Sequence, residues 1–188
     1  MDAPLSADHK IHLFGASGSG TSTLGAALAQ RLSLPHLDVD DFYWRPTNPP
    51  FVEKQQPAQR LLDLNEAMTE SQGWILSGSL CGWGDELIPR FSHAVFLFLQ
   101  PHLRQQRLRL RERQRHGDRI LPGQDMYEIH TEFMAWAARY DSAGLEQRSR
   151  RLHQQWSQKL PCPLLRLDSD QSTDLLTNHV VANLQQPT

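Results

Sequence analysis

The sequence of 188 residues has few cysteines, few lysines and no long apolar run. With only Cys81 and Cys162, it offers no disulfide framework, which favours a reducing, cytoplasmic location. No stretch approaches the roughly 18 consecutive apolar residues that a membrane-spanning helix needs. The polar first residues, MDAPLSADHK, lack the apolar core of a secretory signal. We therefore expect a cytoplasmic protein with no membrane partner.

An excess of charge of one sign is also missing, since the formal net charge is −2. A chain so nearly balanced lacks the broad basic surface of a nucleic-acid-binding protein, and no nucleic-acid partner is expected. The basic residues are three lysines and 16 arginines. Arginine grips phosphate oxygens with a planar fork, although a GC-rich genome would also produce this preference.

Short apolar runs alternate with helical patterns along the whole chain. The apolar runs, typical of buried strands, occupy residues 10–14, 34–39, 74–76, 93–99 and 163–168. Apolar residues recur at helical spacing in residues 22–34, 58–70, 125–160 and 172–184, and in the segment after Pro101. This alternation predicts an α/β fold, with a five-stranded, mainly parallel sheet flanked by helices, in a single domain over residues 1–188.

A glycine-rich segment, GASGSGTST at residues 15–23, follows the first predicted strand and precedes the first predicted helix. In this context a P-loop reads G-x-x-x-x-G-K-[ST], and Gly15, Gly20 and Ser22 take the matching positions. Such glycines let backbone N–H groups converge on phosphate oxygens, although glycines also mark ordinary tight turns. We predict an ATP-binding loop made of Gly15, Ser17, Gly18, Ser19, Gly20, Thr21, Ser22 and Thr23.

The lysine of the P-loop is absent, because Thr21 stands in its place. Threonine can donate a hydrogen bond to phosphate but cannot neutralise the charge that develops during phosphoryl transfer. Ser22 is at the position whose hydroxyl binds Mg²⁺. We therefore expect ATP and Mg²⁺ as cofactors, and an arginine from elsewhere in the fold in the role of the lysine.

Three further segments join the glycine loop in a family resemblance: PHLDVDDFYW at 35–44, WILSGSLCGWGD at 74–85 and RILPGQDMYEIH at 119–130. Together they resemble the P-loop kinases related to nucleoside monophosphate kinases. They are most similar to bacterial proteins labelled adenylate kinase-like or AAA-family ATPase, whose GSGTST loops lack the lysine. The resemblance covers nearly the whole chain. It implies a P-loop NTPase fold, and an arginine-rich lid at about residues 111–125 that closes over ATP.

Carboxylates follow the second predicted strand, where ligands of open α/β sheets bind. Asp38 and Asp40 alternate, so in a strand they share a face. We assign Asp38 to substrate binding and Asp40 to catalysis, where it orders the water around Mg²⁺ or accepts a hydrogen bond from an acceptor hydroxyl. A helix N-cap followed by a solvated turn is the alternative.

The third predicted strand ends in Ser77-Gly78-Ser79, without the Asp that related kinases commonly place there. Beyond it, Trp83 either stacks on a flat ligand or serves as a buried anchor. The resemblance places Arg90 near the phosphate of the acceptor. We therefore include Trp83 and Arg90 among the predicted substrate-binding residues.

The segment after Pro101 concentrates the arginines. Arg104, Arg107, Arg111 and Arg115 form one stripe of a helix, and a solvated charged face is the simpler reading. In the related kinases this helix leads into the lid, whose arginines stabilise transition-state charge. The resemblance thus implies Arg111 and Arg119 as catalytic residues. Arg148, Arg150 and Arg151 are expected on a solvated helical surface, although one of them could reach an acceptor.

These features predict an ATP-dependent kinase that transfers the γ-phosphoryl group to a small-molecule acceptor. A nucleotide or nucleotide-like molecule, such as a nucleoside monophosphate, is the leading acceptor class. The missing lysine and the missing third-strand Asp keep two alternatives open: a nucleotide-binding regulatory module and a plain ATPase. The oligomeric state is left open.

Overall fold

A parallel sheet forms the centre of the molecule, a computed structural model in which residues 8–185 are described. The N-terminal residues 1–7, part of the segment searched for a secretory signal, and the last three residues of the predicted domain lie outside the described residues. The strands, in the spatial order β2-β3-β1-β4-β5, are β1 (Lys10–Gly15), β2 (His36–Asp38), β3 (Trp74–Ser77), β4 (His93–Phe98) and β5 (Leu164–Asp168). All four pairings are parallel, which confirms the predicted sheet.

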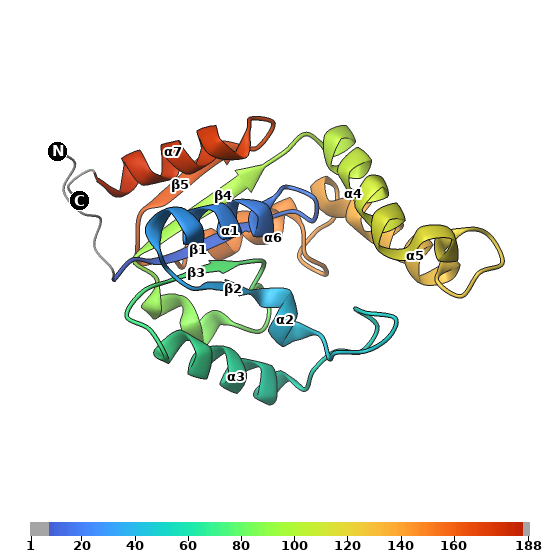
Figure 1. The fold of residues 1–188 in the computed structure, drawn as a ribbon, viewed down its shortest axis with the longest axis horizontal. Coiled ribbons are helices and arrows are strands. Elements are labelled where there is room, and N and C mark those ends of the chain that lie inside the picture. The colour runs from blue at the N-terminus through green and yellow to red at the C-terminus, as the bar shows by residue number, and fades with distance from the viewer. Residues whose placement is uncertain (1–7, 186–188) are drawn as a thin grey trace.

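Helices cover both faces of this sheet (Figure 1). On one face α1 (Thr21–Leu32) and α7 (Thr173–Leu184) pack over an apolar cluster that includes Ile11 and Leu13 of β1. On the other face α3 (Pro57–Thr69) and α6 (Arg150–Ser157) pack over a second cluster that includes Phe14. Because successive side chains of a strand point to opposite faces, the one strand β1 supplies both cores.

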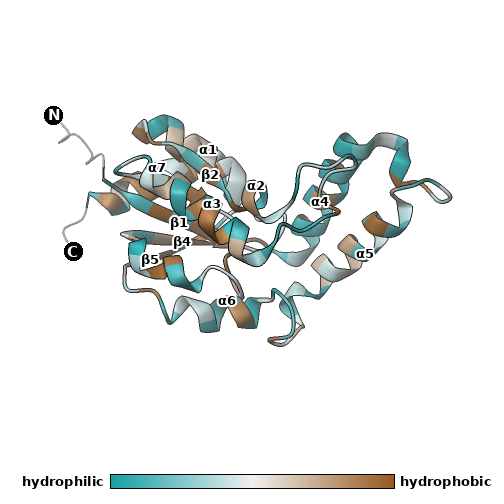
Figure 2. Cartoon of the chain, turned by 90° about the horizontal axis from the view of Figure 1, so that it is seen from below, coloured by the Kyte–Doolittle hydropathy of each residue, from teal (hydrophilic) through white to brown (hydrophobic). Residues whose placement is uncertain are grey.

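Two helices extend beyond the sheet as an arm (Figure 2). They are α4 (Pro101–His116) and α5 (Tyr127–Ala138), joined through the short 3-10 turn η2 (Gly117–Ile120). The first residues of the predicted lid, 111–116, are therefore the last turns of a helix, whereas the resemblance implied a lid beginning there. Closure of this arm over a ligand stays a prediction.

The predicted helical region 125–160 is divided in the structure. Helix α5 is followed by a 3-10 turn at Arg139–Asp141, and α6 begins only after Ser149. The hydroxyl of Ser149 accepts a hydrogen bond from the N–H of Leu152 at 3.0 Å, which makes Ser149 the N-cap of a separate helix. Of the described helices, none is both long enough and apolar enough to cross a membrane.

A short helix, α2 (Val39–Tyr43), stands where the sequence analysis extended the second strand. The side chain of Asp38 accepts a hydrogen bond from the N–H of Asp40 at 3.0 Å and so caps this helix. Asp40 thus belongs to α2, and the prediction that it shares a strand face with Asp38 is wrong. The cap turns the chain one residue earlier than the apolar pattern indicates.

Candidate functional site

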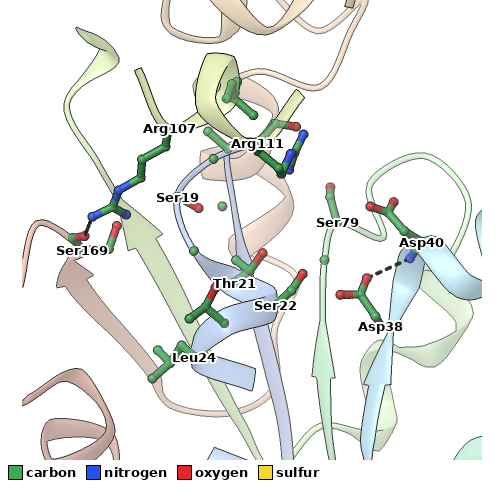
Figure 3. Close-up of a pocket in the computed structure, with 18 of the residues that line it drawn as sticks. Ser19, Thr21, Ser22, Leu24, Asp38, Asp40, Ser79, Arg107, Arg111 and Ser169 are labelled. Carbon is green, nitrogen blue, oxygen red and sulfur yellow. Dashed lines mark hydrogen bonds between the residues drawn. The ribbon is translucent and has the colours of Figure 1, made fainter. Parts of the chain in front are cut away.

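A cavity of about 500 Å³ opens where the parallel strands end (Figure 3). Several segments that are distant in the sequence line it. They are residues 15–24, Asp38 and Asp40 after β2, Gly78 and Ser79 after β3, three arginines of α4, Arg148, and Ser169, Gln171, Thr173 and Leu176. The whole predicted ATP-binding loop therefore lies at the same cavity as the predicted carboxylates.

The glycine loop is shaped for close packing and for an anion. Gly18 and Gly20 have φ of 82° and 92°, a conformation that side-chain-bearing residues rarely adopt. A Cβ on Gly18 would lie 3.0 Å from Cγ of Leu108 in α4. Helix α1 begins directly after Gly20. The N–H groups of its first turn have no acceptor within the helix, and no side chain caps them. Uncapped amides at a helix N-terminus fit a phosphate group.

Oxygen ligands lie on two sides of the cavity. The hydroxyl of Ser22 is on the loop side, and the carboxylates of Asp38 and Asp40 are opposite (Figure 3). Among residues 8–185, no group of three or more His, Cys, Asp or Glu side chains is arranged to hold a metal. Mg²⁺ commonly uses one or two carboxylates and completes its shell with water and substrate phosphates. The donor set of Ser22 and the aspartates fits an ion held in that way.

Asp38 is fixed in place by a short chain of hydrogen bonds. One carboxylate oxygen accepts the N–H of Asp40, and the other accepts the hydroxyl of Ser77 at 3.0 Å. The hydroxyl oxygen of Ser77 lies 2.9 Å from Nε2 of His36. Because Ser77 gives its proton to Asp38, we infer that the ring of His36 donates to Ser77. Burial lowers the pKa of His36, which favours the neutral ring. Asp38 therefore serves as a helix cap and as a cavity wall at once.

Asp40 faces the open cavity but is surrounded by its walls. The protein atoms of these walls reduce the hydration of its carboxyl, although the residue itself is exposed, and so raise its pKa above the ordinary value of 3.8. Arg148 opposes that shift, Asp38 adds to it, and Arg111 and Arg115 oppose it less strongly. A carboxyl whose pKa is moved toward neutrality is better matched to accept a proton from a hydroxyl group.

Of the three arginines Arg148, Arg150 and Arg151, Arg148 is the one that lines the cavity, and the sequence did not single it out. Its Nη2 donates to the hydroxyl of Ser17 in the glycine loop at 2.6 Å, and its guanidinium lies 4.8 Å from the centre of the Trp136 ring. Burial lowers the pKa of Arg148, and the negative charge of Asp40 opposes this shift. Its position just before the N-cap Ser149 is the one available signal, because a residue there does not continue the helical surface of Arg150 and Arg151.

The arginines of α4 divide between the site and the core. Arg107, Arg111 and Arg115 line the cavity. The Nη2 of Arg107 donates to the carbonyl of Ser169 at 2.9 Å, and its Nη1 would lie 3.7 Å from a Cβ on Gly20. Arg104, the fourth member of the predicted stripe, is instead buried, donates from Nε to the carbonyl of Leu99 and pairs with Asp141. The stripe is therefore not a uniformly solvated face.

Arg119 does not line the cavity in this structure. It is exposed in the arm, where its Nη2 lies 2.5 Å from Oδ2 of Asp125. The hydrogen bond between them raises the pKa of Arg119 and lowers that of Asp125. A catalytic role for Arg119 thus depends on movement of the arm and stays a prediction.

Two predicted substrate-binding residues, Arg90 and Trp83, are absent from the cavity wall. Arg90 donates to the carbonyls of Asn65 and Met68 at 3.2 and 3.0 Å, and so satisfies the C-terminal turns of α3. Trp83 packs against the guanidinium of Arg60 at 4.9 Å, and its N–H donates to the carbonyl of Ser79 at 3.3 Å. Each side chain is engaged by the protein outside the cavity, so contact of either residue with an acceptor stays a prediction.

Comparison with known proteins gives one strong relative and several weaker ones. No protein-family model matches the chain. YqaC of Bacillus subtilis, described as an uncharacterized protein, is 45% identical over 171 residues, which span 91% of this chain and 94% of YqaC. A shikimate kinase of Bacteroides thetaiotaomicron is 29% identical over 130 residues, 64% of this chain and 73% of the kinase.

Solved structures establish the fold. A shikimate kinase from Bacteroides thetaiotaomicron matches 95% of this chain and 99% of its own at a TM-score of 0.59 and 21% identity. A gluconokinase from Sinorhizobium meliloti matches 95% and 92% at a TM-score of 0.54 and 16% identity. The chain thus has the P-loop NTPase fold of these small-molecule kinases, which confirms the predicted fold class. The narrower adenylate kinase-like assignment is not confirmed.

Proposed function

Because the chain belongs to the same family as YqaC and has the fold of shikimate kinase and gluconokinase, we propose that it is an ATP-dependent kinase of a small hydroxylated molecule. One observation carries the proposal: a phosphate-shaped glycine loop faces Asp40 across a single cavity that arginines also line. A phosphoryl donor, a proton acceptor and compensating positive charge are the three requirements of this reaction, and residues for each meet there.

The glycine loop binds the phosphoryl donor in this proposal. The uncapped N–H groups at the start of α1 and the hydroxyls of Thr21 and Ser22 hold the phosphate oxygens of ATP. Ser22, together with Asp40 or its neighbour Asp38, would hold Mg²⁺. When bound, the ion supplies neutralising charge at the phosphate oxygens.

Arginines supply the charge that Thr21 lacks. Arg148 reaches the loop through Ser17, Arg107 lies beside Gly20, and Arg111 lines the opposite wall. A guanidinium stays charged even when partly buried and can bind two oxygens of one phosphate group. We assign the role of the missing lysine to Arg107, Arg111 and Arg148 together, and keep Arg119 for a closed arm.

Asp40 acts on the acceptor. Its carboxylate accepts the proton of the acceptor hydroxyl, and the raised pKa of Asp40 brings the group closer to the working pH. Because positioning and electrostatics account for most of phosphoryl-transfer catalysis, no covalent intermediate is required.

The acceptor class has two candidates. The names of the relatives favour a hydroxylated carboxylic acid such as shikimate or gluconate. The sequence resemblance favours a nucleoside monophosphate. Only the hydroxylated acid needs Asp40 as a proton acceptor, because the phosphate group of a nucleoside monophosphate is largely deprotonated at neutral pH. Both classes present an anionic group to the arginines, so one panel tests them together.

The experiment measures ADP release from ATP and Mg²⁺ with and without shikimate, gluconate and the nucleoside monophosphates. We expect one acceptor to stimulate release, and Asp40→Asn to abolish the stimulation. Asp63→Asn on α3 is the matched control, because Asp63 does not line the cavity and, among residues 8–185, its side chain accepts a hydrogen bond only from Gln59. Tight ATP binding without stimulation by any acceptor would favour the regulatory module, and equal turnover without acceptor would favour a plain ATPase.

A further inference from the structure

Three buried side chains form a hydrogen-bonded chain that ends at the cavity. The hydroxyl of Ser79 lies 2.9 Å from Nε2 of His153, and Nδ1 of the same ring lies 2.8 Å from the hydroxyl of Tyr140. Their residues are 7%, 1% and 4% exposed, respectively. Ser79 alone of the three lines the cavity, at the end of β3 between the glycine loop and the aspartates (Figure 3).

The proton of each group in this chain can be placed. Burial lowers the pKa of His153 to about 3, so the ring is neutral at pH 7 and carries one proton. Burial raises the pKa of Tyr140, so its hydroxyl stays protonated. Among the described residues, the hydroxyl of Tyr140 has no other hydrogen-bond partner than His153. Since a buried O–H group without an acceptor is costly, Tyr140 donates to Nδ1.

The tautomer of His153 follows from that direction. With Nδ1 accepting, the single ring proton is on Nε2, which then donates to the oxygen of Ser79. The hydroxyl proton of Ser79 must therefore point elsewhere. The neighbouring thiol of Cys81 lies within hydrogen-bonding reach of Ser79, and burial raises its pKa to about 11, so it stays protonated. A neutral thiol is a weak acceptor, and an anionic oxygen in the cavity competes with it for the proton of Ser79. The strongest acceptor that the proton can reach is therefore an anion in the cavity, which Ser79 lines.

We propose that Ser79 is a hydrogen-bond donor to an anionic oxygen of the ligand in the cavity, and that His153 and Tyr140 are positioning residues that hold it in this role. Arg148, another donor, lines the same cavity, so the two side chains together suit an oxyanion. The oxyanion is either a phosphoryl group of ATP or the carboxylate of an acceptor acid. The identity of that ligand rests on the proposed function, whereas the tautomer of His153 does not.

The first measurement is the tautomer in the protein without added ligand. Long-range ¹H–¹⁵N correlation of the imidazole ring, with the His153 signals identified by their loss in His153→Gln, distinguishes Nδ1–H from Nε2–H. We expect the Nε2–H form in the wild type and a loss of that bias in Tyr140→Phe, which removes only the hydroxyl. An Nδ1–H ring in the wild type overturns the assignment of Ser79 as a donor.

The second measurement is binding by calorimetry of ATP with Mg²⁺, inorganic phosphate, shikimate and gluconate to wild type and Ser79→Ala. We expect at least one probe to bind about 10- to 100-fold more weakly to the variant, because a hydrogen bond to a charged group is lost. Weaker ATP or phosphate binding identifies a phosphoryl oxygen, and weaker binding of an acid alone identifies a carboxylate. Ser157→Ala is the control, since within the described part of the chain the hydroxyl of Ser157 bonds only to the carbonyl of Gln154 on α6.

The outcomes separate this inference from the proposed function. Unchanged affinities in a folded Ser79→Ala variant that still transfers phosphate overturn the inference and leave the kinase proposal standing. If ligand binding depends on Ser79 but no acceptor stimulates turnover, the inference stands and the kinase proposal falls. If the wild type binds none of the probes, both fail. For Tyr140→Phe we expect a higher KM for the ligand that Ser79 binds and little change in kcat. General structural damage would instead lower both kcat and the melting temperature.

Discussion

The two walls of the cavity are made in different ways. The glycine loop is one continuous segment, and in the proposed site its backbone N–H groups after Gly20 hold the ligand. The arginine wall comes from α4 and from Arg148, and in the proposed site its long side chains hold the ligand. The first wall needs a local backbone conformation, and the second needs tertiary packing. A kinase can therefore lose the lysine of its loop if the second wall provides the charge.

The largest effect that we expect is on the arginine wall, from Arg148→Ala. Loss of this cation removes charge beside the loop and leaves Asp40 without its strongest opposite charge. Arginines that act on phosphoryl transfer contribute about 10³-fold or more to kcat, and we expect a loss of that order in kcat/KM. Arg151→Ala, an exposed neighbour, should leave the rate unchanged. Equal effects of the two substitutions would remove Arg148 from the site.

A smaller loss is expected from Arg111→Ala, which removes one of several cations of the same wall. One charge-assisted hydrogen bond corresponds to about a 10- to 100-fold loss in kcat/KM. The comparison variants are Arg119→Ala and Asp125→Ala. If the arm closes on the ligand, Arg119→Ala lowers kcat while Asp125→Ala does not, because Asp125 only holds Arg119 in the open position. Equal small effects would show that the pair acts only within the arm.

On the loop wall we expect about a tenfold loss of ATP affinity from Gly20→Ala. Gly20 has a φ of 92°, so a side chain strains the backbone at the start of α1 by about 1 kcal/mol and displaces the amides. Gly82 has a φ of 84° with open space around it, and it lies outside both the cavity wall and the predicted lid. Gly82→Ala should therefore lower the free energy of unfolding similarly and leave ATP binding intact. Calorimetry and urea unfolding of both variants check this.

The smallest effect that we expect is a shift in the pH dependence of kcat/KM, because Arg148 influences the pKa of Asp40. Asp40 must be deprotonated to accept a proton, so activity falls as the pH drops through its raised pKa. Arg148 lowers that pKa, so Arg148→Gln should move the acidic limb of kcat/KM to higher pH. Arg148→Lys keeps the charge and should move it less. An unmoved limb in Arg148→Gln would mean that Asp40 is not the titrating base.

The sequence was most informative where function resides in consecutive residues. The loop at 15–23 lies between a strand and a helix as predicted, and the five strands match their apolar runs. It was less informative where a side chain caps a helix and so starts a new element inside an apolar pattern. The cap by Asp38 places Asp40 in α2, and the cap by Ser149 starts a separate helix within the predicted helical region 125–160. Side-chain hydrogen bonds of this kind depend on one rotamer, which hydrophobic periodicity does not report.

Single side chains far apart along the chain were the least predictable. Arg90 and Arg148 are both arginines near turns, yet one satisfies carbonyls of α3 and the other reaches Ser17 across the cavity. Similarly, nothing in the separation of 74 residues between Ser79 and His153 indicates that they share a hydrogen bond.

The amino-acid sequence by itself determined the alternation of strands and helices, the parallel sheet and the phosphate-shaped loop, because each follows from residue periodicity or from glycine at consecutive positions. Tertiary structure alone decided which arginines face the loop, which one is buried beside Asp141, and which serine ends a buried hydrogen-bonded chain. A long side chain reaches several ångströms in many directions, and only the packing of the elements around it selects one.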